Sequence, residues 1–273
     1  MQGNKNGPFV PTNALDAAGQ KRDEHTLSMV QDAIKRQNVM LAYQPVVQTL
    51  QPDRVAYFEA LIRVVDETGR VIAAKEFIDE IEASETGRML DCLALEEGLC
   101  TLAREPELRL GINMSARSIG NRGWQRILDH WIERDPTVAE RLILEITESS
   151  AMGASDQVVQ FMTKLQSWGI SFALDDFGSG FTTFRHFKQF TFDILKIDGQ
   201  FIRGIANDTD SQVITRAMVS IAQHFDMFTV AEFVEHAEDV MFLTDIGIDC
   251  LQGYYFGAPT LSPHWGKDLR HQA

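Results

Sequence analysis

The chain of 273 residues is 44% hydrophobic and carries a formal net charge of -14, so it can enclose a sizeable core, in one β/α barrel or in two smaller domains. Binding to polymeric nucleic acid depends on clustered Lys and Arg that neutralise phosphates, and the acidic balance argues against such a partner. No stretch suits a transmembrane helix or a signal peptide, and the three cysteines are unclustered, so we expect a cytoplasmic protein without disulfides or a cysteine metal site.

The first predicted elements are irregular. Residues 1–24 are rich in Gly, Pro and Asn without hydrophobic periodicity, and we expect a disordered leader there. A helix is predicted at 23–36. Two extended segments, 39–48 and 54–64, are joined by a short turn and not by a helix, so they should pair antiparallel. Because Pro45 has no N–H to donate, the first strand should lie near a sheet edge or end there.

One sequence pattern repeats after helices expected at 74–83 and 89–104. A short apolar run ends in a polar residue and leads into an amphipathic stretch, such as 156–168 or 208–224. The apolar runs are 108–112, 142–144, 170–174, 192–195, 228–231 and 248–251. Strands that alternate with helices form parallel β/α units. We therefore predict an α/β fold, a modified TIM-type (β/α)8 barrel over 25–262 with an antiparallel first strand pair, followed by a C-terminal tail at 263–273.

Polar residues stand at the carboxyl ends of these runs. In a β/α barrel all such ends open onto one face, so these side chains should converge there. The residues are Asn113, Glu145, Glu148, Asp175, Asp176, Lys196, Asp198, Glu232, Glu235 and Gln252. Burying the adjacent carboxylates of Asp175 and Asp176 without cations between them would cost several kcal/mol or force one to protonate. The pair therefore indicates a divalent cation, or two.

The ordered set of motifs resembles the EAL-domain family, bacterial phosphodiesterases that hydrolyse cyclic di-GMP. The motifs are Glu59-Ala60-Leu61, Asn113, Glu145-Ile146-Thr147-Glu148, Asp175-Asp176-Phe177-Gly178, Lys196-Ile197-Asp198, Glu232-Phe233-Val234-Glu235 and Gln252-Gly253-Tyr254. The resemblance runs from about Leu27 to Pro259. It rests on the whole set, because the three letters Glu-Ala-Leu alone carry no weight.

The resemblance implies ligands for two divalent ions, and such oxygen ligands suit Mg²⁺ or Mn²⁺. The implied ligands are Glu59, Asn113, Glu145 and Asp175 for one ion, with Asp175 and Asp176 for the second. Two such ions can activate a water for in-line attack on a phosphodiester and neutralise charge on the transferring phosphorus. The implied product is linear pGpG.

Other matching positions are implied to act around the metals. Glu232 and Lys196 are the implied catalytic residues, Glu232 as a general base or metal-site glutamate and Lys196 by holding the water or a phosphate oxygen. The implied substrate contacts are Gln44, Arg63 and Gln252. The implied supporting residues are Glu148, Asp198 and Glu235. Glu148 would steady the loop after the Asp pair, whereas Glu235 is equally consistent with a helix-start acid.

Three functional hypotheses stay open. Every ligand position that can be mapped is filled, which favours a phosphodiesterase. The alternative is a catalytically weak or inactive receptor that binds cyclic di-GMP and signals to a partner. The observation behind this alternative is Phe233, which stands where the family most often has Gly and adds bulk beside Glu232. A third hypothesis is an unrelated β/α-barrel enzyme that uses metal to stabilise an enolate.

The resemblance also implies partners beyond the small-molecule substrate. Family members often dimerise through helices next to the Asp-pair loop, and many are regulated by an attached sensory domain. We therefore expect a homodimer, with the aromatic-rich stretch 184–192 as the candidate surface. A sensory domain or protein partner would lie outside this chain.

Overall fold

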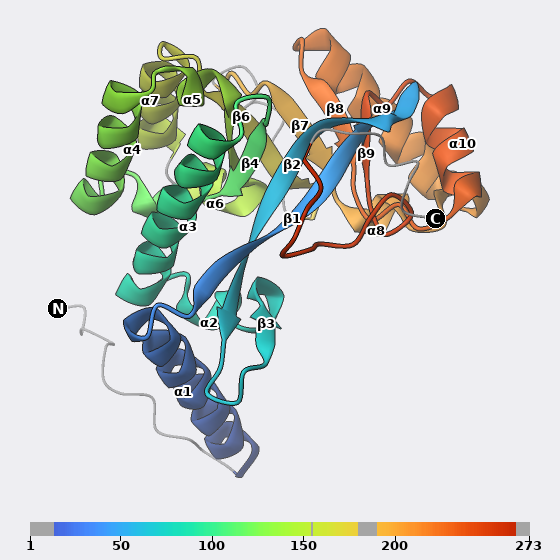
Figure 1. The fold of residues 1–273 in the computed structure, drawn as a ribbon. Coiled ribbons are helices and arrows are strands. Elements are labelled where there is room, and N and C mark those ends of the chain that lie inside the picture. The colour runs from blue at the N-terminus through green and yellow to red at the C-terminus, as the bar shows by residue number, and fades with distance from the viewer. Residues whose placement is uncertain (1–13, 154, 180–189, 266–273) are drawn as a thin grey trace, which may run out of the picture.

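A closed barrel organises the computed structural model, which describes residues 14–153, 155–179 and 190–265 (Figure 1). Within these residues, eight strands form the barrel wall. They are β1 (Val39–Gln48), β2 (Gln51–Val65), β4 (Leu110–Asn113), β5 (Leu142–Thr147), β6 (Ser171–Phe177), β7 (Ile194–Ile197), β8 (Phe228–Ala231) and β9 (Cys250–Gln252). Each of the six apolar runs expected as a strand overlaps one of these strands.

The order of pairing closes the barrel. From β2 through β9, the barrel strands are parallel neighbours in sequence order, whereas β1 is antiparallel to both β2 and β9. This arrangement confirms the expected α/β barrel with an antiparallel first pair. A short strand, β3 (Val71–Ala73), pairs antiparallel with the last residues of β2. It was not expected, because three residues are too few to show an alternating pattern.

Helices cover the outside of the barrel (Figure 1). Several begin where a side chain accepts the first free N–H groups, as Ser84, Asn121 and Asp208 do. The helices are α1 (Ala14–Lys35), α2 (Ile78–Ile81), α3 (Glu85–Arg104), α4 (Arg122–Arg134), α5 (Thr137–Arg141), α6 (Glu148–Gly153), α7 (Ser155–Gln166), α8 (Gly199–Ile202), α9 (Thr209–His224) and α10 (Ala237–Asp245). The 3₁₀ turns are η1 (Ala74–Glu76), η2 (Ala116–Ser118) and η4 (Ile205–Asn207). No helix among the described residues is long and apolar enough to cross a membrane.

Three hydrophobic clusters hold these layers together. The largest lies between the strands and the outer helices and includes Leu99, Trp124 and Phe172. A second fills the barrel interior, where inward-facing side chains alternate with outward-facing ones along each strand. The third joins the C-terminal half of α1 to α2, β2 and α3, below the barrel in Figure 1. The barrel interior is therefore packed below its mouth, which leaves the strand ends as the place for an open site.

Both ends of the described chain differ from expectation. Helix α1 begins at Ala14, so residues 14–24, expected to be disordered, are helical. The stretch contains three Ala residues together with Leu, Gln, Lys, Arg and Glu, all of which favour helices. Residues 1–13 lie outside the described residues. At the other end, Trp265 of the expected tail packs edge-to-face on Tyr43 and Phe58, with ring centroids 4.9 and 5.2 Å apart. The barrel contacts therefore continue beyond residue 262.

The expectation that β1 lies near an edge or ends at Pro45 was wrong. Strand β1 continues to Gln48 and has neighbours on both sides. Pro45 lies opposite Phe58, whose N–H donates to Arg109 O on the other side of β2. Because opposite residues in an antiparallel pair exchange either two hydrogen bonds or none, β1 and β2 lose nothing at Pro45.

The candidate dimer surface is only partly described. Residues 180–189 lie outside the described residues. Phe190 and Phe192, at the end of the proposed stretch, are buried and belong to the main hydrophobic cluster. The described aromatic residues of this stretch are therefore core, although Thr191 between them is exposed.

The Arg141 side chain fastens the turn between α3 and β4. Its Nη1 donates to the carbonyl oxygens of Leu102, Glu105 and Leu108 at 2.7, 3.1 and 3.3 Å. We predict that Arg141→Met lowers the free energy of unfolding by about 2–4 kcal/mol, because buried carbonyls lose a charged donor. Urea denaturation measures this, and Arg126→Met, an exposed control, should stay within about 0.5 kcal/mol of wild type. Equal effects in both variants would contradict the prediction.

Candidate active site

The carboxyl ends of the barrel strands surround a cavity of about 450 Å³. Its polar lining includes Gln44, Glu59, Arg63, Asp91, Asn113, Asp175, Asp176, Glu232, Glu235 and Gln252. Strand register places Asn113 beside Glu145 across β4 and β5, and it places Asp175 beside Thr147, two residues farther toward the mouth along β5. The convergence expected from the strand ends is therefore present.

Lys196 lies at the centre of this site and is fully buried. Its Nζ lies 2.6 Å from Glu145 Oε2, 2.9 Å from Asp175 Oδ1, 3.0 Å from Glu232 Oε1 and 3.4 Å from Glu59 Oε2. One ammonium thus bridges carboxylates from four other strands or strand ends. A buried charge of this kind is tolerated only when it is paired, so Lys196 and the acids depend on one another.

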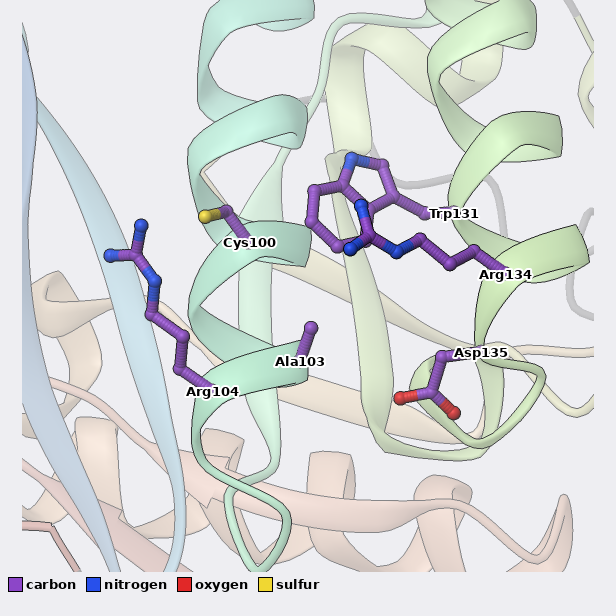
Figure 2. Close-up of a pocket in the computed structure, with 6 residues that line it drawn as sticks. All are labelled: Cys100, Ala103, Arg104, Trp131, Arg134 and Asp135. Atoms are coloured by element: carbon purple, nitrogen blue, oxygen red, sulfur yellow. The ribbon is translucent and has the colours of Figure 1, made fainter.

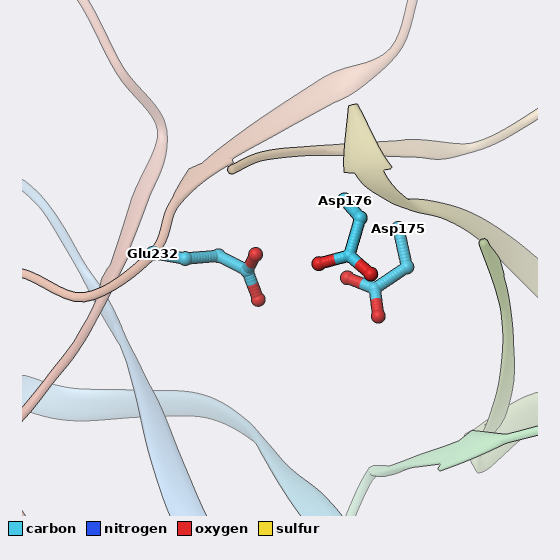
Figure 3. A group of neighbouring side chains, drawn as sticks. All are labelled: Asp175, Asp176 and Glu232. Atoms are coloured by element: carbon cyan, nitrogen blue, oxygen red, sulfur yellow. The ribbon is translucent and has the colours of Figure 1, made fainter. Parts of the chain in front are cut away.

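Some carboxylate oxygens of the site have no hydrogen-bond partner. Glu145 Oε1, Asp175 Oδ1 and Glu232 Oε2 are buried without one, although Asp175 Oδ1 has its ionic contact with Lys196. Oxygens of Asp175, Asp176 and Glu232 lie within 4.8 Å of one another, and Figure 3 shows the three side chains directed toward a common space. This donor set fits a cation with a preference for oxygen ligands.

Burial is the main cause of the shifted pKa values in the site. Burial raises the pKa of Glu145 to about 8 and the pKa of Glu232 well above its usual range. Burial and the neighbouring Asp175 raise the pKa of Asp176 to about 6. Burial lowers the pKa of Lys196, but the surrounding carboxylates outweigh it and raise that pKa well above its usual value. One ammonium does not keep all these acids ionised at neutral pH.

Glu59 differs from the other acids because amide groups also hold it. Asn113 Nδ2 donates to Glu59 Oε1 at 2.8 Å, and Gln252 Nε2 donates to Glu59 Oε2 at 2.5 Å. These bonds and Lys196 outweigh burial and lower the pKa of Glu59. Gln252 Nε2 also lies 3.3 Å from Gln44 Oε1, and Gln44 Nε2 donates to Gly257 O. Asn113, Gln252 and Gln44 therefore form a hydrogen-bonded support around Glu59.

The expected supporting residues lie farther out. Glu148 Oε2 accepts the N–H of Gly178 at 3.0 Å, two residues after Asp176, and Asp198 accepts from Gln200 N at the start of α8. Neither carboxylate lines the cavity. Glu235 is exposed at the cavity wall, 4.0 Å from a guanidinium nitrogen of Arg203.

Arg63, an expected substrate contact, is half-buried in the cavity wall and donates to Ile62 O at 2.9 Å. Asp91, which the sequence analysis did not single out, also lines the cavity and accepts from Ser118 Oγ and Ser115 N. Burial raises its pKa to about 6. Asp91 was missed because it lies within α3 and not at a strand end. The available signal was an acid directly after buried Leu90.

Backbone strain marks two positions in the site. Asp176 and Phe233 have φ angles of 53° and 54°, in the left-handed region that few non-glycine residues adopt. Asp176 directly follows Asp175, and Phe233 directly follows Glu232. Both of these preceding acids form ion pairs with Lys196. Strained conformations of this kind persist where surrounding contacts fix them, and they concentrate at functional sites.

A second hollow, of about 610 Å³, lies between α3 and α4 (Figure 2). It is lined by Cys100, Ala103, Arg104, Trp131, Arg134 and Asp135. The guanidinium of Arg134 lies 5.6 Å from the Trp131 ring centroid, a cation–π contact. This lining lacks the converging carboxylates of the barrel mouth, so the barrel mouth is the candidate active site.

Known proteins resemble this chain over most of its length. A family model described as EAL domain matches residues 27–259. The chain is 29% identical over 234 residues to the cyclic di-GMP phosphodiesterase PdeB of Shewanella oneidensis, and the match covers 84% of this chain and 27% of that protein. The chain spans less than half of the length of the curated relatives it matches.

Solved structures share the barrel. The PaMucR phosphodiesterase in complex with c-di-GMP superimposes with a TM-score of 0.75 at 28% identity, covering 86% of this chain and 97% of that one. The FimX EAL domain from Pseudomonas aeruginosa, bound to c-di-GMP, has a TM-score of 0.80 at 22% identity, covering 88% and 98%. The FimX likeness shows the fold alone.

The position of Lys196 predicts a large effect of its removal. In the absence of divalent metal, Lys196→Met should lower the free energy of unfolding by about 3–5 kcal/mol, because it leaves buried carboxylates without their partner. Urea denaturation in EDTA measures the effect. Lys35→Met is the matched control, since Lys35 forms an exposed ion pair with Asp32 that should contribute about 0–1 kcal/mol. A loss no larger than that of the control would refute the central role of Lys196.

Proposed function

The chain belongs to the EAL domain family, and from this premise we propose that it is a metal-dependent phosphodiesterase that hydrolyses cyclic di-GMP to linear pGpG. The observation that carries the proposal is the acidic cluster at the barrel mouth, in which Glu59, Glu145, Asp175 and Glu232 surround Lys196. Asn113 and Asp176 line the same cavity. The names of PdeB and PaMucR support the reaction class. Membership of the family argues against the unrelated enolate-forming enzyme.

Charge supports two divalent ions, Mg²⁺ or Mn²⁺. The acids of the cluster are Glu59, Glu145, Asp175, Asp176 and Glu232. With all five ionised, Lys196 balances one charge, and two divalent ions would balance the remaining four. Glu59, Asn113, Glu145 and Asp175 would hold one ion, and Asp175 with Asp176 the other, with Glu232 close by. When bound, such ions lower the pKa of water and neutralise charge on a phosphodiester.

Glu232 and Lys196 would act on the attacking water and the acids. Glu232 Oε2 is buried without a hydrogen-bond partner. Once bound cations keep Glu232 ionised against the effect of burial, this oxygen would accept a proton from a water beside it. The Lys196 ammonium would keep the carboxylates in register and would be available to a phosphate oxygen once metal ions share those carboxylates. Glu232 would thus supply general-base catalysis, and Lys196 would supply electrostatic stabilisation.

The cavity walls would bind the nucleotide. Arg63 has the planar donor fork that suits phosphate, and Gln44 and Gln252 lie beside the acids. Ile78 and Leu90 contribute an apolar wall suited to a purine face, and Asp91 supplies an acceptor for its N–H groups. The site would therefore combine carboxylates that bind metal with cavity walls that contact a base and a phosphate.

We further propose a homodimer and a sensory domain or protein partner outside this chain, with a cytoplasmic location. The partner proposal is supported by the curated relatives, which are more than twice as long as the segment they share with this chain. Regulation would then reach the barrel mouth from outside the described residues.

A non-hydrolysing receptor for the same nucleotide is the second candidate. Phe233 favours it, because a bulky residue in a left-handed conformation replaces the more common glycine beside Glu232. The filled set of ligand positions favours the enzyme. The two candidates differ in product formation and not in binding.

Turnover decides between them. Purified protein incubated with cyclic di-GMP and Mg²⁺ or Mn²⁺ should yield pGpG, detectable by chromatography, and EDTA should abolish product because the acids cannot replace the ions. Binding measured by calorimetry without any pGpG would reject the enzyme and leave the receptor. Absence of both binding and product would reject both.

Asp176 provides a sharper test of the second ion. Asp176→Asn should cut kcat by about 10²-fold or more while cyclic di-GMP binding is partly retained, because the variant loses a charge that holds metal and keeps the shape of the side chain. The control is Asp245→Asn, an exposed change at the end of α10. Turnover of Asp176→Asn near that of the control would refute the two-metal assignment.

A further inference from the structure

Phe233 is confined between two anchored neighbours. Glu232 N donates to Ile197 O at 3.2 Å, which ties it to β7, and Val234 N donates to Gln252 O at 2.9 Å, which ties it to β9. Phe233 makes the turn between them with a φ of 54°. A bulky residue disfavours this conformation, so contacts of its side chain must hold it.

Two residues of the neighbouring α8 segment hold the Phe233 ring. A Cβ added at Gly199 would approach Phe233 Cγ to 2.8 Å and Phe233 Cβ to 2.9 Å, so the ring rests where Gly199 has no side chain. From the other end of α8, the Arg203 guanidinium carbon lies 4.1 Å from the ring centroid. Glu235 Oε1 lies 4.0 Å from Arg203 Nε, which steadies the guanidinium. We call Gly199, Arg203, Phe233 and Glu235 the latch.

We propose that Arg203 is a positioning residue, which holds the segment after β8 against α8 through Phe233 and so keeps Glu232 directed at Asp175 and Asp176. Phe233 is the next residue after Glu232. A change in the φ angle of Phe233 would therefore rotate the peptide bond that joins the two residues and would reorient Glu232. Figure 3 shows the Glu232 carboxylate extended toward the two aspartates, the arrangement that the latch would preserve. The proposed metal role of Glu232 rests on the proposed function.

The latch explains how Phe can stand where the family most often has glycine. Glycine adopts a left-handed conformation without side-chain contacts, and its flexibility leaves the segment free to move. Phenylalanine in the same conformation requires support, and here Arg203 and the bare Gly199 provide it. The segment is then fixed in one arrangement beside the acids.

The test measures the segment directly and the metal separately. Arg203→Ala should raise the amide hydrogen-exchange rate of Val234, because the segment opens more often. An exposed cation–π contact corresponds to about a two- to five-fold change, and the Kd for Mn²⁺ alone, measured by calorimetry, should rise by a similar factor. Arg216→Ala is the matched control. The Arg216 guanidinium carbon lies 4.8 Å from the centroid of the Phe242 ring, and neither residue lines the cavity. It should change neither quantity.

A double substitution separates the latch from general destabilisation. In a Phe233→Gly background, Arg203→Ala should have no further effect on Val234 exchange, because the ring is already absent. Arg203→Lys should recover part of the wild-type value, since it keeps a cation over the ring. Equal effects of Arg203→Ala with and without Phe233 would overturn the latch.

The outcomes also separate this proposal from the proposed function. Unchanged Val234 exchange in Arg203→Ala overturns the latch even if the protein hydrolyses cyclic di-GMP. Increased exchange with an unchanged Mn²⁺ Kd overturns the positioning of Glu232. Mn²⁺ binding that depends on Arg203, without pGpG formation, supports the latch and rejects the enzyme. Absence of Mn²⁺ binding in the wild type rejects the metal role in both proposals.

Discussion

The contact between one ammonium and several carboxylates at the barrel mouth is the constraint on which the site depends. Lys196 is fully buried, and each acid around it would be costly to bury alone. Burial raises the pKa values of Glu145 and Glu232 even with the ammonium beside them, so these acids resist ionisation. The barrel thus stores a surplus of negative charge at one end, which oxygen-seeking cations would relieve.

The same contacts contribute to barrel closure. Gln252 on β9 donates to Glu59 on β2 and lies beside Gln44 on β1, so these three side chains cross the strands where the sheet closes on itself. Strand β1 runs opposite to its neighbours, and its backbone pairs with β9 over only a few residues. Side-chain hydrogen bonds at the mouth therefore reinforce the part of the barrel where backbone pairing is short. The candidate active site and the closure of the barrel therefore share residues.

Most of the fold and most of the site could be predicted from strand ends. Apolar runs followed by polar residues identify parallel strands, and parallel strands direct their last residues to one face. Gln44, Glu59 and Arg63 lie within β1 and β2 and were predicted only from the resemblance to the EAL-domain family. Other features were indicated by neither signal. Asp91 enters the cavity from the middle of α3, and Pro45 continues a strand because its missing N–H faces away from β2. Lys196 was expected as one site residue among several. Its central position was not expected, because a sequence does not show which charged group contacts all the others.

The geometry after Asp175 explains how two adjacent acids reach one site. Successive side chains of a strand point to opposite faces, so Asp176 would face away from Asp175 if β6 continued regularly. Its φ of 53° breaks that alternation and brings its carboxylate close to those of Asp175 and Glu232. The chain that follows β8 makes a similar left-handed turn at Phe233, directly after Glu232. Asp enters the left-handed region several-fold more often than most residues, whereas Phe does so at greater cost. The Asp pair can thus be arranged by its own backbone, while the Glu232 end of the site needs contacts from a neighbouring element.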